Sequence, residues 1–334
     1  MSNSINPPLN STWLLPQGVN EILPVEARVL ENLRRDVLDE LQAHDFQLVF
    51  PPMMEFLDSL IQGAGANLTT QTFKVPDYDS HKTLGIRADM TPQLAQIDAH
   101  RLHNNAINRL CYIGTVLRTR PMTLGGSREL LQLGAEIFGD ASLEADQAII
   151  DAMLQVLKLS GIESTTLSLS HVAIFSTLVD VLELPESLSS LLFDAILRKS
   201  APDIALIDSQ NKQDLSIFQG LLSCRGSADV LNVFLDLLKQ YPNLADNNII
   251  INALTELQQL ASYLQNSTID VHIDLAELHG YRYHTGLTFQ AFVAGEGRAI
   301  AKGGRYNGIS SDADTTRPAT GFSADLKVLA QFVA

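Results

Sequence analysis

Residues 117–136 read LRTRPMTLGGSRELLQLGAE, a glycine-rich segment between two stretches of strand-forming residues. The flanking stretches, Arg109 to Arg118 and Arg128 to Phe138, are both predicted to be long strands. Two long strands joined by a glycine-rich loop favour an antiparallel pair whose loop projects over a site. The sequence around this loop therefore predicts a β-hairpin at the centre of the fold.

Three residues of the second strand are polar or minimal in size and share one face. Because side chains alternate across a strand, Gln132, Gly134 and Glu136 point to the same side. Such a face is unusual for a hydrophobic core and suits the floor of a polar site. A sheet face in contact with solvent is the alternative interpretation.

The N-terminal part of the chain mixes helices and short strands. Apolar spacing from Val25 to Leu41, with Pro24 at the start, predicts a helix. Phe46 to Phe50 is predicted as a strand that Pro51-Pro52 ends. Further predictions are a short hairpin formed by Phe73 to Val75 and Lys82 to Arg87, and a helix from Thr91 to His103 with Thr91 as its N-cap.

In the later part of the chain the sequence pattern changes from strand to helix and then back to strand. A helix is predicted from Leu143 to Leu159, and Val172 to Leu264 reads as short amphipathic helices. Strand signals then return at Ile269 to Leu275, Arg282 to His284, Leu287 to Val293 and Arg298 to Lys302, and a last helix is expected from Gly321 onward. The predicted fold class is α+β, an antiparallel sheet flanked by helices with an all-helical insertion. We expect a flexible lead-in at residues 1–20, a core of residues 21–171 and 266–334, and the insertion at residues 172–265.

Composition narrows the class of protein. Hydrophobic residues make up 46% and charged residues 18%, which is typical of a globular chain, and the net charge of −15 disfavours a nucleic-acid partner. No apolar run is long enough to span a membrane, and the N-terminus lacks the regions of a signal peptide. Cys111 and Cys224 are isolated from each other, which suits a reducing cytosol and gives no metal-binding spacing. We expect a cytoplasmic protein without a metal or cofactor.

The opening hairpin resembles motif 2 of class II aminoacyl-tRNA synthetases, and of the histidyl enzyme in particular. That motif has an arginine, a glutamate two residues later, a loop, then Arg-Glu-Phe-x-Gln and a glutamate four residues on. Arg118, Gln132 and Glu136 fall on matching positions. The resemblance implies a class II synthetase-like fold.

Three other segments resemble the histidyl enzyme in the same order along the chain. Leu84 to Pro92 is similar to its Leu-Arg-Pro-Glu-Gly-Thr segment, with Asp89 and Thr91 on the Glu and Thr, although a helix N-terminus needs the same residue types. In the segment from His279 to Phe289, Tyr283 and His284 fall on a tyrosine pair that lines the family's histidine pocket. Residues 303–308, GGRYNG, are close to Gly-Gly-Arg-Tyr-Asp-Gly, and residues 318–329 resemble motif 3.

The groups that activate an amino acid in that family are replaced. Arg120 or a neighbour stands where motif 2 has its glutamate, His279 where the catalytic arginine lies, and Val328 where motif 3 has its arginine. Loss of one such electrostatic group typically costs about 3–4 kcal/mol of transition-state stabilisation. We therefore expect no catalytic residues and no aminoacylation. The chain also ends at its motif 3 segment, so no anticodon-binding domain and no tRNA are expected.

The residues that would hold histidine are kept. By resemblance, its ammonium would contact Asp89 and Thr91, and its carboxylate would contact Arg118 and Gln132. The imidazole would be left to other residues of the site. Those residues are Glu136, Tyr283 and His284.

This pattern resembles the regulatory subunit of short-form ATP phosphoribosyltransferase more than any active synthetase. The resemblance implies a homodimer within a hetero-octamer with a separate catalytic chain, activation of that chain in the first step of histidine biosynthesis, and feedback inhibition by L-histidine. Two alternatives stay open. One is a minimal histidyl-tRNA synthetase-like enzyme, and the other is a ligand-free interaction module of synthetase fold.

Overall fold

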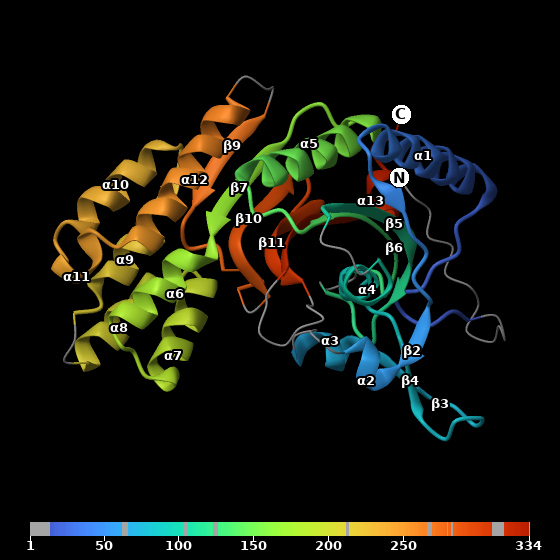
Figure 1. The fold of residues 1–334 in the computed structure, drawn as a ribbon, viewed down its shortest axis with the longest axis horizontal. Helices are drawn as coiled ribbons and strands as arrows, with labels where there is room; N and C mark the ends of the chain where they lie inside the picture. The colour runs from blue at the N-terminus through green and yellow to red at the C-terminus, as the bar shows by residue number, and fades with distance from the viewer. Residues whose placement is uncertain are drawn as a thin grey trace.

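The computed structural model describes residues 14–61, 66–102, 106–122, 126–211, 214–265, 269–278, 280–281, 283–308 and 317–333. Within these residues the main sheet has nine strands in the order β1-β5-β6-β12-β11-β10-β7-β9-β8 (Figure 1). The strands of this sheet are β1 Gln47–Leu48, β5 Asn108–Leu117, β6 Glu129–Phe138, β12 Arg317–Asp325, β11 Ala301–Gly308, β10 His284–Phe292, β7 Thr166–His171, β9 Asp270–Asp274 and β8 Arg225–Gly226. Pairing is antiparallel except between β1 and β5 and between β7 and β9.

One face of the main sheet, here called the back face, carries most of the hydrophobic core. Leu133, Ala135 and Ile137 of β6 alternate onto this face and are at most 1% exposed. Three helices supply apolar side chains to the same core: α1 Pro24–Ala43, α5 Leu143–Leu159 and α12 Asn248–Leu264. The period-2 pattern of β6 thus meets the helical periodicity of these segments, which explains why both were readable from the sequence.

The opposite face, here called the front face, is covered only in part. A smaller core lies between it and helix α4 Thr91–Ile97, and it includes Met90, Leu94, Tyr112 and Tyr306. A three-stranded sheet of β2 Met54–Phe56, β4 Thr83–Ile86 and β3 Phe73–Pro76 adjoins α4. The remaining elements of this region are α2 Leu57–Leu60, α3 Ala66–Gln71 and the π-helical turn η1 Asp98–Leu102.

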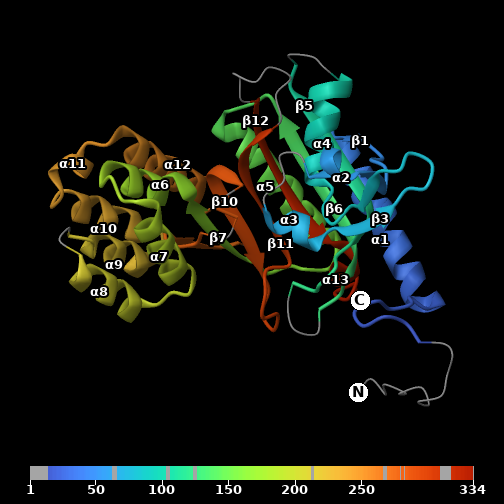
Figure 2. The same cartoon turned by 90° about the horizontal axis from the view of Figure 1, so that it is seen from below.

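A group of helices lies at one end of the molecule, away from the three-stranded sheet in both views (Figures 1 and 2). Its elements before α12 are α6 Val172–Val181, α7 Glu186–Leu197, α8 Ala201–Gln210, α9 Ser216–Ser223, α10 Asp229–Leu238 and α11 Pro242–Ala245, with β8 between α9 and α10. Ring contacts of Phe175 with Phe193, Phe218 and Tyr281 join this group to the segment that precedes β10. The division into a core and an inserted domain stays a prediction.

The α+β class and the synthetase-like sheet are confirmed, and several local predictions are corrected. No long helix begins at Gly321, because Arg317–Asp325 forms β12 and the final helix α13 spans only Leu326–Leu329. The strand expected over Arg298 to Lys302 instead begins at Ala301 and extends through the GGRYNG segment to Gly308 as β11. Arg282 lies outside the described residues, and the two strands expected around it correspond to the single strand β10, with an irregular register between His284 and Thr288.

Two N-terminal elements are shorter than predicted. The strand expected over Phe46 to Phe50 is reduced to Gln47–Leu48. The helix expected to reach His103 ends as an α-helix at Ile97 and continues as η1. Residues 1–13 of the expected lead-in lie outside the described residues.

A buried ion pair fixes β11 to α5 behind the front face. The Arg305 guanidinium donates to the Asp146 carboxylate at 2.7 and 3.1 Å and to the backbone oxygens of Asp140 and Ser142. The two side chains are only 13% and 2% exposed. Neighbouring side chains on a strand alternate, so anchoring Arg305 at the back directs Tyr306 to the front.

We predict that Arg305→Met lowers the free energy of unfolding by about 3–5 kcal/mol, because it leaves the buried Asp146 carboxylate without its counter-ion. Arg198→Met is the matched control, since the Arg198–Asp203 pair is 62% and 45% exposed and such pairs contribute at most about 1 kcal/mol. Urea unfolding monitored by circular dichroism measures both. Equal effects of the two substitutions would contradict this role for the buried pair.

Candidate functional site

The front face of the sheet holds the polar residues that the sequence analysis singled out. Gln132 and Glu136 lie on this face of β6 and are 3% and 2% exposed. A sheet face in contact with solvent is therefore the wrong interpretation of their spacing. Small residues surround them, because a Cβ at Gly321 would overlap the Glu136 carboxylate and a Cβ at Gly134 would meet the Tyr112 hydroxyl at 2.5 Å. Glycine at these positions is what leaves room for the polar side chains.

Asp89 and Gln132 are joined directly. The Gln132 amide Nε2 donates to Asp89 Oδ1 at 3.0 Å, and its Oε1 accepts from the Met90 backbone N–H at 2.9 Å. Asp89 Oδ1 also accepts from the Thr91 backbone N–H at 2.9 Å. The helix-terminus and site interpretations of Asp89 are thus compatible. Thr91 is the first residue of α4 and not its N-cap, which corrects the sequence-based assignment.

Glu136 is held by two hydroxyl groups from different elements. Thr91 Oγ1 donates to Glu136 Oε1 at 3.1 Å, and the Tyr306 hydroxyl donates to Oε2 at 3.0 Å. The Tyr112 hydroxyl lies 3.2 Å from Thr91 Oγ1 and extends this network. Burial raises the pKa of Glu136 to about 8, although both hydroxyl donors oppose that rise. The carboxyl group is therefore mostly protonated at pH 7.

Tyr283 and His284 complete one side of the site. The Tyr283 ring stacks on the Tyr306 ring with centroids 4.8 Å apart, and His284 meets Tyr283 edge-on at 5.3 Å. Gly280, at φ +78°, forms the turn before them, and a Cβ there would lie 2.5 Å from the His284 ring. Burial lowers the pKa of His284 to about 4, so this imidazole is neutral at pH 7.

Arg118 directly follows the last residue of β5 and contacts the residue before Asp89. Its Nε donates to the Ala88 backbone oxygen at 3.2 Å. Its own backbone pairs with Arg128 across the motif 2 loop, of which residues 123–125 lie outside the described residues. The predicted site residues are therefore linked through hydrogen bonds, ring contacts or adjacent backbone.

Three front-face residues were missed by sequence reasoning: Tyr112, Lys302 and Tyr306. Tyr306 lies within the GGRYNG motif, and strand alternation from Arg305 could have placed it in the site. Tyr112 pairs with Gly134 in the hairpin register, and a tyrosine opposite a glycine is a usable signal. Lys302 follows from alternation only once β11 is known to be a strand.

The comparisons with known proteins agree with this geometry. Residues 18–329 match the family model described as histidyl-tRNA synthetase. The ATP phosphoribosyltransferase regulatory subunit of Burkholderia pseudomallei (strain 668) is 42% identical over 96% of this chain and 82% of the relative, and that of Burkholderia thailandensis shows the same values. The chain belongs to this family of regulatory subunits.

Solved structures confirm the fold of this family member. A chain described as an ATP phosphoribosyltransferase regulatory subunit/histidyl-tRNA synthetase from Bacillus halodurans has a TM-score of 0.85 at 25% identity, covering 97% of this chain and 84% of that one. A chain of the ATP phosphoribosyl transferase (HisG:HisZ) complex from Thermotoga maritima has a TM-score of 0.68 at 17% identity, covering 88% and 96%. At that identity the second likeness concerns the fold alone.

Of the three positions where the resembled enzyme has activating groups, two lie in the described part of this regulatory subunit. Arg120 is exposed, and Val328 on α13 packs against the main hydrophobic core. His279 lies outside the described residues. Among the residues described, no group of three or more His, Cys, Asp or Glu side chains is placed to hold a metal ion. No described helix combines the length and apolar character needed to cross a membrane.

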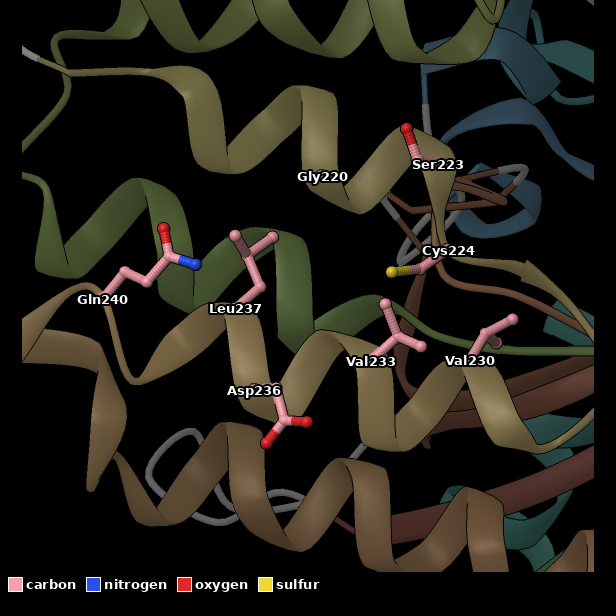
Figure 3. Close-up of a pocket in the computed structure, with 8 residues that line it drawn as sticks. All are labelled: Gly220, Ser223, Cys224, Val230, Val233, Asp236, Leu237 and Gln240. Atoms are coloured by element: carbon pink, nitrogen blue, oxygen red, sulfur yellow. The ribbon is translucent and has the colours of Figure 1, made fainter.

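A recess lies in the helical group, between α9 and α10 (Figure 3). It has a volume of about 460 Å³ and is lined by Gly220, Ser223, Cys224, Val230, Val233, Asp236, Leu237 and Gln240. None of the predicted site residues lines it. The polar front face and this recess are separate features of the subunit.

We predict that Glu136→Gln removes part of the pH dependence of stability. The unfolded carboxyl ionises near pH 4.5 and the folded one near pH 8. The protonated Glu136 side chain thus makes its full contribution to the free energy of unfolding below pH 4.5. This contribution is lost as the pH rises toward 8, by about 1.4 kcal/mol per pH unit. Unfolding midpoints from pH 5 to 8 should fall less steeply for Glu136→Gln than for the wild type. The exposed Glu163→Gln is the control, and parallel slopes for all three proteins would contradict the assignment.

Proposed function

We propose that this chain binds L-histidine on its front face and transmits feedback inhibition to a separate ATP phosphoribosyltransferase catalytic chain, which it otherwise activates. The observation that carries the proposal is a pair of carboxyl groups, half-buried Asp89 and buried Glu136, each positioned by a partner from another element. Such a network restricts a ligand to one orientation, because each polar group of that ligand must find its complement.

The two carboxyl groups match the two nitrogen-bearing parts of histidine. Asp89 is half-buried and offers acceptor capacity for an ammonium group, with Gln132 fixing its position. Glu136 is deeper, beside the stacked rings of Tyr283 and Tyr306, where an imidazole ring finds both an acceptor and aromatic surface. The ligand would thus lie with its side chain inward and its amino-acid group outward.

Regulation requires that histidine bind one arrangement of the complex more tightly than another. Thr91 and Tyr306 make Glu136 a junction between α4, β6 and β11, so a ring inserted at Glu136 would act on all three elements. A differential affinity of about 1–3 kcal/mol corresponds to a 5- to 150-fold change in activity. Both activation and inhibition can then be carried by the same fold without catalytic residues of its own.

We predict that adding this chain to the purified short-form catalytic transferase raises its turnover, and that L-histidine lowers the turnover of the mixture. The rate of phosphoribosyl-ATP formation and co-elution in size-exclusion chromatography measure the two effects. A chain that neither co-elutes nor alters the rate contradicts the regulatory role. Histidine-dependent pyrophosphate exchange by the chain alone would instead support the synthetase-like enzyme.

We predict that histidine affinity has an optimum between about pH 6.5, the ordinary pKa of imidazole, and about pH 8, where empty Glu136 ionises. Within this window one proton is shared by Glu136 and the ligand ring, so binding changes no proton count. Below this window the free ligand ring and the free Glu136 side chain each carry a proton, so binding must release one. Above the window neither carries a proton, so binding must take one up.

Calorimetric titrations from pH 5.5 to 8.5 test this window. Affinity should fall about tenfold per pH unit outside it, because each unit changes the cost of the transferred proton by about 1.4 kcal/mol. Glu136→Gln should lose the decline above pH 8. A wild-type affinity that does not vary with pH would contradict the role of Glu136, and no binding at any pH would favour the ligand-free interaction module.

We further propose a homodimer within a hetero-octamer. The support is a ten-residue segment, 47–56, that exposes five large apolar side chains in the described structure: Leu48, Phe50, Met53, Met54 and Phe56, at 42–77%. Val25, near the start of α1, is 79% exposed. Apolar surface of this density is typical of a protein interface.

We predict that Phe50→Asp shifts the free chain from dimer to monomer, because it places a charge at the centre of this apolar segment. Val233→Asp is the control, since Val233 is 61% exposed on α10 at the other end of the molecule. Sedimentation equilibrium distinguishes the 36.5 kDa monomer from its dimer. A dimer that persists in Phe50→Asp would contradict this interface.

A further inference from the structure

We propose that Lys302 on β11, with Arg118, forms the subsite for the α-carboxylate of the amino acid bound at the front face. This inference rests on the histidine-binding function proposed above and adds to it the group that recognises the ligand's negative charge. It places specificity for an intact amino acid on a lysine that the sequence analysis did not assign.

The register of the sheet sets the position of Lys302. It pairs with Ser323 on β12, and Ser323 pairs with Gly134 on β6, so the three residues form one row across the front face. Adjacent strands lie about 4.8 Å apart, which puts the lysine backbone about 10 Å from β6. The residues between are small, so a lysine side chain can extend over them toward the end of β6 where Gln132 lies.

Alternation along β11 gives the same orientation independently. Arg305 points to the back face, where it pairs with Asp146, and Tyr306 points to the front, where its hydroxyl reaches Glu136. Residues 302, 304 and 306 share that front side. A Cβ at Gly304 would lie 2.8 Å from the His284 ring, so the residue between Lys302 and Tyr306 is also free of bulk.

The charges around Lys302 define the chemistry of the subsite. Desolvation by the surrounding protein lowers the pKa of its ammonium group, Asp89 opposes that shift, and Arg118 adds to it. The charge of Lys302 also contributes to the lowered pKa of His284. Lys302 is nevertheless open to solvent. It therefore remains accessible to a ligand while lying within electrostatic reach of both Asp89 and Arg118.

A further hydrogen-bond donor is needed for the ligand carboxylate, because the Gln132 side chain already makes hydrogen bonds within the protein. Its carbonyl oxygen accepts from Met90 and its amide donates to Asp89, which leaves only one N–H for a ligand. The ammonium and carboxylate of an amino acid are attached to the same carbon. An ammonium at Asp89 consequently places the carboxylate within a few ångströms, where Lys302 and Arg118 supply positive charge.

The same cations could attract a nucleotide phosphate, which shares the chemistry of an anionic oxygen ligand. Asp89 favours the carboxylate. The Asp89 carboxylate attracts the ammonium group of a zwitterion, while the two neighbouring cations attract the carboxylate of that ligand. The same Asp89 charge repels a group that carries more than one negative charge. We therefore assign the subsite to the carboxylate and use the nucleotide as the opposing outcome of the test.

Calorimetric titration of the full-length chain with L-histidine, L-histidinol and ATP tests this subsite. Histidinol keeps the ammonium and imidazole but has a hydroxymethyl group in place of the carboxylate. Lys302→Met should weaken histidine binding roughly 10- to 100-fold and leave histidinol binding nearly unchanged. Lys302→Arg should restore most of the preference for histidine. Lys239→Met is the control, because the Lys239 side chain is 72% exposed at the C-terminal end of the distant α10 helix.

The outcomes separate this inference from the function on which it rests. No histidine binding by the wild type would overturn both proposals. Wild-type binding with an unchanged preference for histidine over histidinol in Lys302→Met would overturn only the lysine subsite. Equal losses for both ligands, or a loss of ATP binding with histidine binding intact, would overturn it as well.

Discussion

The carboxyl group of Glu136 accepts hydrogen bonds from Thr91 on α4 and from Tyr306 on β11, and it is nearly inaccessible to solvent. This one side chain joins three segments that are far apart in the sequence. Its burial raises the pKa to about 8, so the empty site holds a mostly neutral acid at pH 7. A ligand that can share the proton is the natural complement of such a group.

The rest of the fold can be understood as support for that network. The back face of the sheet is closed by α1, α5 and α12, and the Arg305–Asp146 pair anchors β11 there. Because alternate residues of the same strands face forward, the stable back face positions Gln132, Glu136, Lys302 and Tyr306 on the front. Packing energy and ligand recognition are thus separated by the pleat of the sheet.

Sequence reasoning recovered the elements whose periodicity is strong and local. The β5–β6 hairpin and helices α1 and α5 were predicted to within a few residues, because alternation or helical spacing is unbroken there. It was wrong about the bounds of β11, where a strand was expected only over Arg298 to Lys302, and about β12, where a helix was expected from Gly321. The misassigned segments contain Gly303 and Gly321. Those glycines are required by contacts with Phe289 and Glu136 across neighbouring strands, and such tertiary constraints leave no local pattern.

The site was predictable from resemblance more than from spacing. Asp89, Thr91, Gln132 and Glu136 stand at positions where the family's motifs are readable, and the structure brings them together. Tyr112 and Lys302 carry no motif, so only the sheet register reveals that they face the same region. The hydrogen bond from Gln132 to Asp89 is likewise seen only in the structure, and it changes which residue is expected to bind the ligand carboxylate.

The central claim is that the network around Asp89 and Glu136 senses histidine on behalf of a catalytic chain. The most direct measurement is a histidine dose–response of the reconstituted transferase with wild-type or Asp89→Asn subunit, each normalised to its own activity without histidine. Asparagine can still accept the Thr91 N–H bond but removes the charge that would hold the ammonium group. We predict at least a tenfold rise in the half-inhibitory histidine concentration for Asp89→Asn. An unchanged dose–response would contradict it.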